Sequence, residues 1–348
     1  MEPRFGRVIT AMITPFAANG SLDLEGAVEL ARWLVEQGND GLVLAGTTGE
    51  SPTLTHDEQV ALVEAVASAV DCHVIAGAGS NDTAAAVELT ERCTAVGADA
   101  ILTVTPYYNR PSQLGLFHHF RAVAEATTLP VMLYDIPIRS GRKIDTATSL
   151  RLADEVQNVV AVKDAAGDVG ETARLVAAAP DGFDIYSGED ALTLSLLAVG
   201  AGGVVSVASH WATPETVAMV DACFSGDVAG ATAANQRLIP SWAFESGDLN
   251  PNPIPTKAMM KVLGLPGGDC RPPMGPEPDD LQDLARRLLV GLGRGWPQPD
   301  VVFHGISCTP NVPRRAGRDR SQLRCLGVRG THCVAGLRTA VPRRPSWG

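Results

Sequence analysis

The sequence predicts a closed parallel (β/α)8 barrel followed by a small C-terminal helical annex. Between residues 6 and 210, eight short apolar runs recur, each followed by a Gly- or Thr-bearing turn and a helix-like stretch. The stretches between the runs are amphipathic, as expected of helices that connect parallel strands. Eight repeats of this unit favour a closed barrel over a doubly wound sheet.

The eight apolar runs are the predicted strands. In chain order they read VITAMITPF, DGLVLAG, CHVIAGAG, AILTVTPYY, PVMLYDIP, VVAVKDAAG, FDIYSGED and GVVSVASH. Their nearly continuous apolar character is typical of parallel strands, because such strands are covered on both faces.

The segments between the runs carry helix patterns and helix-end signals. LEGAVELARWLVEQG and TAAAVELTERCTAVG place apolar residues on one helical face. Thr55, with Glu58 three residues later, forms a candidate capping box at the start of a helix. Residues 39–40 and 97–99 each close one helix and open the next strand.

We assign the chain to three parts. Residues 1–210 form the barrel strands and helices, residues 211–294 the last barrel helix and the annex, and residues 295–348 an extension. In the second part the strand signal vanishes, and helix-like segments follow at 213–225, 227–245, 253–264 and 278–292. The extension has nine arginines, two acidic residues and no periodicity. We expect it to be disordered, weakly packed or foreign to the fold, and disfavour a nucleic-acid-binding arm because aromatic interleaving is missing.

Composition excludes several classes of protein. A formal net charge of −11 argues against a general nucleic-acid or membrane-surface binder. No apolar run approaches the roughly 20 residues of a membrane helix, and the N-terminus has no signal-peptide core, so we expect a cytoplasmic protein. The seven cysteines form no CxxC pair or cysteine–histidine group, which argues against a disulfide framework or a metal site.

Lys163 ends an apolar run and is the first candidate for chemistry. The carboxyl ends of barrel strands converge on one face, where barrel enzymes have their active sites. Only four of the 28 basic residues are lysines, so arginine supplies most of the positive charge. A deprotonated lysine in a dry pocket can attack a carbonyl and form a Schiff base. The alternatives are a snorkelling lysine or an ion pair with Asp164.

Other strand ends carry groups that suit such a lysine. Thr47, Tyr108 and Tyr134 could form a proton path, because their hydroxyls both donate and accept hydrogen bonds. The Thr47-Thr48-Gly49 turn offers N–H and hydroxyl groups for a small carboxylate. Arg139, in a Pro- and Gly-framed loop, suits a second carboxylate. Individually these residues are equally compatible with ordinary rim positions.

The motifs resemble those of one enzyme family. In order, GTTGES, VTPYYNRPSQ, YDIP followed by RSG, VKDAAGD, YSGED, GVVSV and NPNPIPTK are similar to the 4-hydroxy-tetrahydrodipicolinate synthases, also called dihydrodipicolinate synthases. These belong to the pyruvate-dependent class I aldolases, which include N-acetylneuraminate lyase. The resemblance covers residues 5–294 and implies a homotetrameric (β/α)8 barrel. It implies condensation of pyruvate with L-aspartate 4-semialdehyde in diaminopimelate and lysine biosynthesis.

The resemblance also implies a role for each motif residue. Lys163 would form the imine with pyruvate, and no metal or organic cofactor is implied beyond this lysine. Thr47, Tyr134 and Tyr108 match the proton relay, with Tyr108 reaching across a dimer interface into the neighbouring subunit. The matching substrate-binding positions are Thr48 for the pyruvate carboxylate, Arg139 for the aldehyde's carboxylate, and Gly188 and Val205 for the pocket wall.

Two other functions fit parts of this pattern. A sialic acid or keto-deoxy-sugar aldolase would keep Lys163, Tyr134 and the GTTGE turn, but Arg139 in its RSG context indicates a short carboxylate-bearing aldehyde. A non-enzymatic barrel with a binding role would be expected to lack part of the constellation, and this sequence retains all of it.

Overall fold

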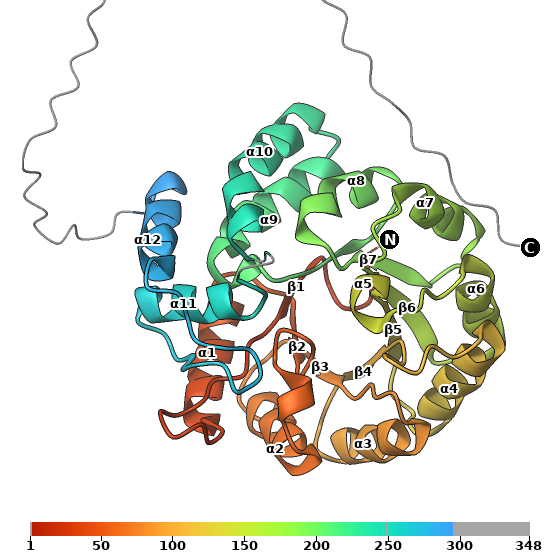
Figure 1. Cartoon of the computed structure of the whole chain (residues 1–348). Helices are drawn as coiled ribbons and strands as arrows, with labels where there is room; N and C mark the ends of the chain where they lie inside the picture. The colour runs from red at the N-terminus through yellow and green to blue at the C-terminus, as the bar shows by residue number, and fades with distance from the viewer. Residues whose placement is uncertain (1, 246, 248–249, 295–348) are drawn as a thin grey trace, which may run out of the picture. The chain divides into compact units, whose positions relative to one another are not determined.

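The computed structural model describes residues 2–245, 247 and 250–294. Eight parallel strands close into a barrel, in which β8 pairs with β1 (Figure 1). The strands are β1 (Val8–Ala11), β2 (Gly41–Leu44), β3 (His73–Gly77), β4 (Ala100–Val104), β5 (Val131–Asp135), β6 (Val159–Asp164), β7 (Asp184–Ser187) and β8 (Gly203–Ser206). The predicted (β/α)8 fold is confirmed. The predicted extension, 295–348, lies outside the described residues.

A helix follows each strand on the outside of the ring (Figure 1). These helices are α1 (Leu24–Glu36), α2 (His56–Ala67), α3 (Thr83–Ala95), α4 (Gln113–Glu125), α6 (Thr146–Glu155), α7 (Val169–Ala178), α8 (Thr193–Ala198) and α9 (Ser209–Phe224). Thr55 and Glu58 form the predicted capping box at the start of α2, where each side chain accepts a hydrogen bond from the other residue's backbone N–H.

Three loops at the carboxyl ends of the strands contain short helical segments. The 3-10 helix η1 (Ser51–Thr53) follows β2, α5 (Pro137–Ser140) follows β5, and the 3-10 helix η2 (Asp190–Leu192) follows β7. These loops contain the GTTGES, RSG and SGED motifs of the predicted site. The predicted site residues therefore come to one end of the barrel.

The remaining helices form the C-terminal annex. They are α10 (Val228–Glu245), which packs on α9, and α11 (Ile254–Leu263), which packs on α12 (Leu281–Gly291) (Figure 1). Helix α9 starts at Ser209, earlier than the predicted segment, which begins at residue 213. The backbone is non-helical at Ala212, just before Pro214, and this kink separates the first turn of α9 from the rest of the helix. The sequence pattern indicated only the part after the kink.

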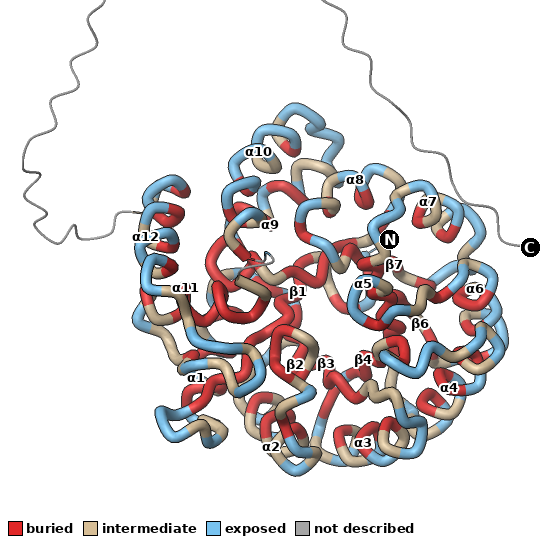
Figure 2. The backbone as a smooth tube through the Cα atoms, in the orientation of Figure 1, coloured by how far each residue is buried: buried red, intermediate tan, exposed pale blue. Residues whose placement is uncertain are grey.

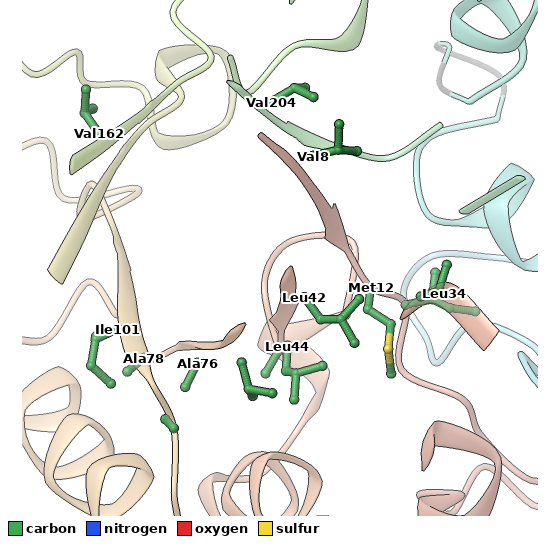
Figure 3. Close-up of a cluster of buried hydrophobic side chains, with 14 of the residues drawn as sticks. Val8, Met12, Leu34, Leu42, Leu44, Ala76, Ala78, Ile101, Val162 and Val204 are labelled. Carbon is green, nitrogen blue, oxygen red and sulfur yellow. The ribbon is translucent and has the colours of Figure 1, made fainter. Parts of the chain in front are cut away.

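The strands separate two apolar layers, which explains why almost all of their residues are buried (Figure 2). The inner layer fills the barrel and includes Ile9, Met132, Tyr134, Ala161, Tyr186 and Val205. The outer layer lies between strands and helices and includes Val8, Leu34, Leu42, Ile101, Val162 and Val204 (Figure 3). Since successive side chains of a strand point to opposite faces, the layer of one residue fixes the direction of the next.

Candidate active site

Lys163 faces the interior of the barrel near the carboxyl end of β6. It lies two residues after Ala161, which belongs to the inner layer, and is only 5% exposed. Its register partner on β5 is Tyr134, and the Lys163 Nζ atom lies 4.5 Å from the centre of the Tyr134 ring. The structure therefore brings together the two residues that the sequence predicted as nucleophile and proton relay.

The surroundings of Lys163 favour loss of its proton. Burial lowers the pKa of Lys163 to about 8; the charges of Asp190 and Glu189 oppose this shift, and the charge of Arg139 adds to it. Three lysines form ion pairs, namely Lys143 with Asp135, Lys257 with Glu50, and Lys261 with Asp269 and Glu277. Among the described residues Lys163 has no such partner. A substantial fraction of Lys163 is therefore neutral near pH 8.

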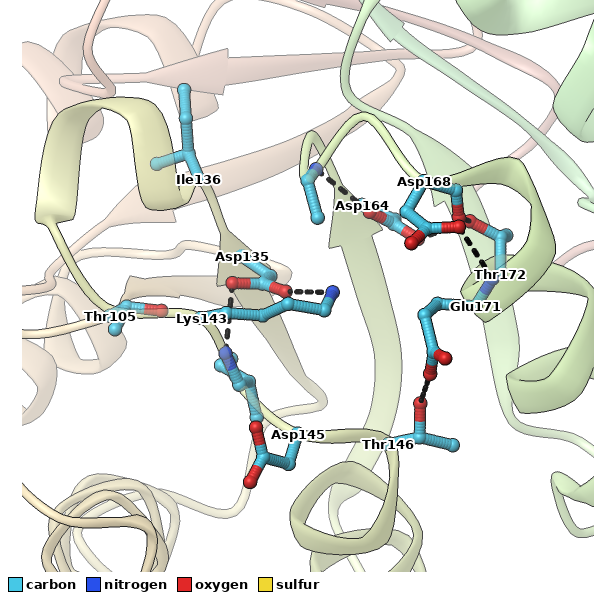
Figure 4. A network of polar contacts seen from close by, with 12 residues as sticks. Thr105, Asp135, Ile136, Lys143, Asp145, Thr146, Asp164, Asp168, Glu171 and Thr172 are labelled. Carbon is cyan, nitrogen blue, oxygen red and sulfur yellow. Dashed lines mark hydrogen bonds and ion pairs between the residues drawn. The ribbon is translucent and has the colours of Figure 1, made fainter. Parts of the chain in front are cut away.

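The acid next to Lys163 in the sequence points away from the barrel interior. Asp164 accepts hydrogen bonds from Thr172 Oγ1 at 2.6 Å and from the Ala166 backbone N–H at 2.9 Å (Figure 4). Asp135 on the neighbouring strand also faces outward, toward the loop that follows β5 (Figure 4). The alternative interpretation of Lys163, an ion pair with Asp164, is therefore wrong.

Tyr134 is a buried member of the inner layer. Burial raises the pKa of Tyr134 to about 12, an effect that the Thr47 side chain opposes in part, so that the Tyr134 hydroxyl keeps its proton at neutral pH and can donate it in a hydrogen bond. Val205, 1% exposed, belongs to the same inner layer as Tyr134.

Gly188 leaves the space that the Lys163 side chain occupies. A Cβ atom at position 188 would lie 2.9 Å from Lys163 Cγ, 3.0 Å from Lys163 Cε and 2.9 Å from Ala165 Cβ. Such distances are too short for carbon atoms that are not bonded to each other. The absence of a side chain at Gly188 therefore lets Lys163 hold its observed position.

The turn that contains Thr48 is fixed by hydrogen bonds from two other parts of the chain. Asn252 Nδ2 donates to Thr48 Oγ1 at 2.9 Å, and Thr14 Oγ1 donates to the carbonyl of Gly49 at 2.6 Å. Because the Thr48 hydroxyl accepts from Asn252, its own hydrogen remains free to donate to a bound anion.

The same turn continues into a buried ion pair with the annex. Lys257 Nζ lies 2.6 Å from Glu50 Oε1, and both side chains are 2% exposed. The Arg271 backbone N–H donates to the other carboxylate oxygen of Glu50 at 2.9 Å. Glu50 has a left-handed backbone with φ of 56°, and these contacts hold it there. Lys257 also lies 4.1 Å from the centre of the Phe16 ring.

Sequence reasoning missed these annex contacts. Asn252 and Lys257 belong to the NPNPIPTK segment, which was noted as a motif without a role for its residues. The only local signal was a lysine and an asparagine in a Pro-rich stretch.

A pocket of about 320 Å³ opens at this end of the barrel. Its lining includes Thr47, Glu50, Tyr107, Ile136, Arg139 and Asn252. Thr47 and Arg139 therefore reach the pocket, whereas Lys163, Tyr134 and Thr48 are buried side chains that do not line it. No group of three or more His, Cys, Asp or Glu residues within the described ranges could hold a metal ion.

Tyr108 is the predicted site residue that this chain does not bring to Lys163. Its side chain is 90% exposed, and its backbone has a φ of 72°. Tyr107, the preceding residue, lines the pocket instead. Of the three predicted relay residues, Tyr134 lies against Lys163 and Thr47 lines the pocket, whereas Tyr108 does neither.

The comparison with known protein families decides the family of this barrel. Residues 4–290 match the model of the dihydrodipicolinate synthetase family. The chain belongs to this family. The family model covers all of the predicted site residues, from Thr47 to Val205.

Individual family members are similar over nearly their whole length. A 4-hydroxy-tetrahydrodipicolinate synthase from Synechococcus is 53% identical over 83% of this chain and 95% of its own, and one from Moorella thermoacetica is 50% identical over 82% and 98%. The crystal structure of a family member from Cyanidioschyzon merolae with lysine bound is 42% identical, covers 84% of this chain and all of its own, and has a TM-score of 0.81. In the present chain, none of the described helices is long and apolar enough to cross a membrane.

Proposed function

We propose that the protein is a 4-hydroxy-tetrahydrodipicolinate synthase, a lyase of the class I aldolase type. It condenses pyruvate with L-aspartate 4-semialdehyde on the route to diaminopimelate and lysine. The observation that carries this proposal is Lys163, a buried lysine without an ion-pair partner among the described residues, with a pKa lowered to about 8. It lies against Tyr134 in a chain that belongs to the dihydrodipicolinate synthetase family.

The chemistry begins with attack of the neutral Lys163 amine on the C2 carbonyl of pyruvate. Loss of water gives a protonated imine, which withdraws electrons and makes the methyl protons acidic. Removal of one methyl proton gives an enamine, whose terminal carbon attacks the aldehyde carbon and forms the new C–C bond. The amino group of the second substrate then attacks the imine carbon, closes the ring and releases Lys163. The lysine serves in place of a metal or organic cofactor.

Each remaining site residue has a distinct role in this scheme. Thr47 and Tyr134 pass protons to and from the reacting atoms, because each hydroxyl can both donate and accept a hydrogen bond and the Thr47 side chain acts on the pKa of Tyr134. Thr48 binds the pyruvate carboxylate with the hydrogen that Asn252 leaves free. Arg139, exposed and on the pocket wall, binds the carboxylate of the second substrate.

Tyr108 acts in the site of a neighbouring subunit of a homotetramer built as a dimer of dimers. Its 90% exposure supports this role, because a tyrosine exposed to that extent does not contribute to the site of its own chain. Ile138, 89% exposed, and Leu114, 57% exposed, are further large apolar side chains that a subunit interface would cover. Native mass spectrometry of the full chain measures the assembly directly.

Incubation with pyruvate and borohydride is expected to add one stable pyruvyl group per chain, on Lys163. The rate of this trapping should rise with pH up to about 8, because burial lowers the pKa of Lys163 to about 8 and only the neutral amine attacks. Intact-mass measurement and peptide mapping from pH 6 to 9 check both points. Labelling of another lysine, or none, contradicts the assignment.

The choice of aldehyde separates the synthase from a sugar aldolase. We expect kcat/KM to be highest for L-aspartate 4-semialdehyde when it is compared with N-acetylmannosamine and glyceraldehyde, because Arg139 offers a partner for a carboxylate. Preference for either sugar would refute the synthase assignment and leave the imine chemistry intact.

Gly188→Ala should slow the reaction without unfolding the protein. The added methyl group would lie 2.9 Å from Lys163 Cγ and displace the amine, so we expect kcat/KM to fall roughly 100-fold. The matched control is Gly291→Ala in α12, where a Cβ atom meets nothing within 4 Å, and its kcat/KM should equal that of the wild type. Wild-type turnover by Gly188→Ala would show that Lys163 tolerates the displacement.

A further inference from the structure

The loop that carries Arg139 is closed at its base by one carboxylate. The loop comprises residues 136–142, after β5, and includes the short helix α5. Asp135, the last residue of β5, accepts a hydrogen bond from Lys143 Nζ at 3.0 Å and another from the Ile144 backbone N–H at 3.0 Å (Figure 4). Because Asp135 precedes the loop and its two partners follow it, these contacts hold the two ends of the loop together.

Both sides of this closure are fixed in place. Asp135 is 4% exposed, so water competes little for its oxygens. On the other side, Gln113 at the start of α4 donates from Nε2 to the carbonyl of Lys143 at 2.9 Å. Its Oε1 accepts the backbone N–H of Asp145 at 3.1 Å. The segment after the loop is therefore anchored to α4, and Asp135 ties the start of the loop to that anchored segment.

Contacts inside the loop give it a compact shape. Ser140 Oγ lies within hydrogen-bond distance of the carbonyl oxygens of Ile136, at 3.0 Å, and of Arg142, at 2.8 Å. The backbone N–H of Arg139 donates to the carbonyl of Ile136 at 3.0 Å. Ile136, Arg139 and Ser140 all line the pocket. The position of the Arg139 backbone therefore depends on where the ends of this compact loop are held.

Arg139 is the one cationic residue among the described residues that line the pocket. The acidic residue of the lining, Glu50, is paired with Lys257. Arg139 itself forms no ion pair with any residue that the structure describes. A guanidinium binds a carboxylate through two parallel hydrogen bonds, and this geometry requires that the guanidinium is accurately placed.

We propose that Asp135 is a positioning residue for Arg139. By closing the loop, it holds the guanidinium where it binds the carboxylate of the second substrate, and so sets the preference for aldehydes that carry a carboxylate. This inference rests on the proposed function, in which Arg139 binds that carboxylate. Asp135 acts only through Arg139, because its own side chain faces outward from the barrel (Figure 4). The YDIP motif does not indicate this role by itself.

The test compares two aldehydes with pyruvate as the other substrate. Succinic semialdehyde and butanal differ in that a carboxylate replaces the terminal methyl group, so the ratio of their kcat/KM values measures the preference for the carboxylate. Asp135→Ala should lower this ratio roughly tenfold. Asp135→Asn should lower it less, because its amide oxygen can still accept the Ile144 N–H. The KM for pyruvate and the yield of borohydride trapping should stay at the wild-type values. If kcat/KM falls by the same factor for both aldehydes, or for neither, the proposal is overturned.

Asp164→Ala is the matched control. Asp164 is the register partner of Asp135 on β6, and it is held by Thr172 Oγ1 and the Ala166 N–H. The turn that it closes carries no proposed substrate-binding residue, so the ratio should equal that of the wild type even where the Tm falls. An equal loss of the ratio in Asp164→Ala and Asp135→Ala would show a general effect of a missing strand-end carboxylate, against the proposal.

A second variant covers the case in which Asp135→Ala does not fold. Lys143→Met removes the cation that Asp135 binds, and the Lys143 side chain is only half-buried, so we expect the variant to fold. It should also lower the ratio and leave the KM for pyruvate unchanged. A wild-type ratio in Lys143→Met would contradict the role of the closure.

These measurements separate the inference from the proposed function. A wild type that forms no pyruvate adduct refutes the proposed function. A wild type that forms the adduct but shows no preference for succinic semialdehyde over butanal refutes the role of Arg139 and, with it, that of Asp135. If the wild type shows both properties and the Asp135 and Lys143 variants keep the preference, this inference alone is overturned.

Discussion

Lys163→Met is expected to lower kcat/KM for the condensation of pyruvate with aspartate semialdehyde by on the order of 10⁴-fold or more. Methionine fills the same volume but has no amine, so neither the imine nor the enamine can form. The fold should survive, because removal of a buried and unpaired ammonium relieves a desolvation cost. Steady-state kinetics and a thermal melt of the same preparation check both expectations.

Lys261→Met is the matched control for this variant. Lys261 is 30% exposed and pairs with Asp269 and Glu277 in the annex, away from the barrel interior. The Lys261→Met protein should have the same kcat/KM as the wild type and should still form the pyruvate adduct on Lys163. Turnover by Lys163→Met within tenfold of the wild type would refute the imine mechanism.

Lys257→Met is expected to give the largest loss of stability. It leaves the Glu50 carboxylate without its cation in a place where only 2% of its side chain is exposed, and loss of one partner of such a pair costs about 3–5 kcal/mol. For a domain of this size we expect a Tm lower by roughly 10 °C. The KM for pyruvate should also rise, because Glu50 follows the turn that holds Thr48. Calorimetry and steady-state kinetics measure the two effects.

A second substitution tests whether the unpaired charge is the cause. The double variant Lys257→Met with Glu50→Gln removes the buried charge and should recover part of the lost Tm. Lys261→Met, on the same helix as Lys257, should cost about 1 kcal/mol or less because its ion pairs are partly exposed. An equal loss of Tm in Lys257→Met and Lys261→Met would show that burial of the Glu50 pair is unimportant.

The barrel could be predicted from the sequence because its signals are local. Each strand is a short apolar run, and helices α1, α2, α3, α4 and α7 start with a capping side chain, as in the Thr55 and Glu58 box of α2. The start of α9 was predicted too late, since the kink before Pro214 interrupts the helical pattern there. Strand order followed from the chain order alone, because parallel strands joined by helices pair with their neighbours.

The position of Lys163 at the mouth of the barrel could also be predicted, although part of the reasoning was incomplete. The scarcity of lysine suggested that each lysine has a special role, and the structure gives three of the four an ion pair. What distinguishes Lys163 is its direction into the inner layer, which follows from the alternation along β6. Proximity of Tyr134 follows in the same way, because β5 and β6 pair in register at these two residues.

The supports of the site could not be predicted from one sequence. Asn252 contacts Thr48 across 204 residues, and Lys257 meets Glu50 from a helix outside the barrel. No local pattern encodes which residue of a distant segment will face a given loop.

The contact between Thr48 and Asn252 also limits how early during synthesis of the chain the site can be complete. At a synthesis rate of roughly 5–20 residues per second, Asn252 leaves the ribosome's catalytic centre some 10–40 s after Thr48. Lys257 follows it. After the strands that carry Tyr134 and Lys163 have been made, and before Asn252 and Lys257 follow, the turn that carries Thr48 and Glu50 lacks these annex contacts. A nascent chain is therefore expected to hold its reactive amine without an ordered substrate site, and catalysis begins only after the annex has folded onto the barrel.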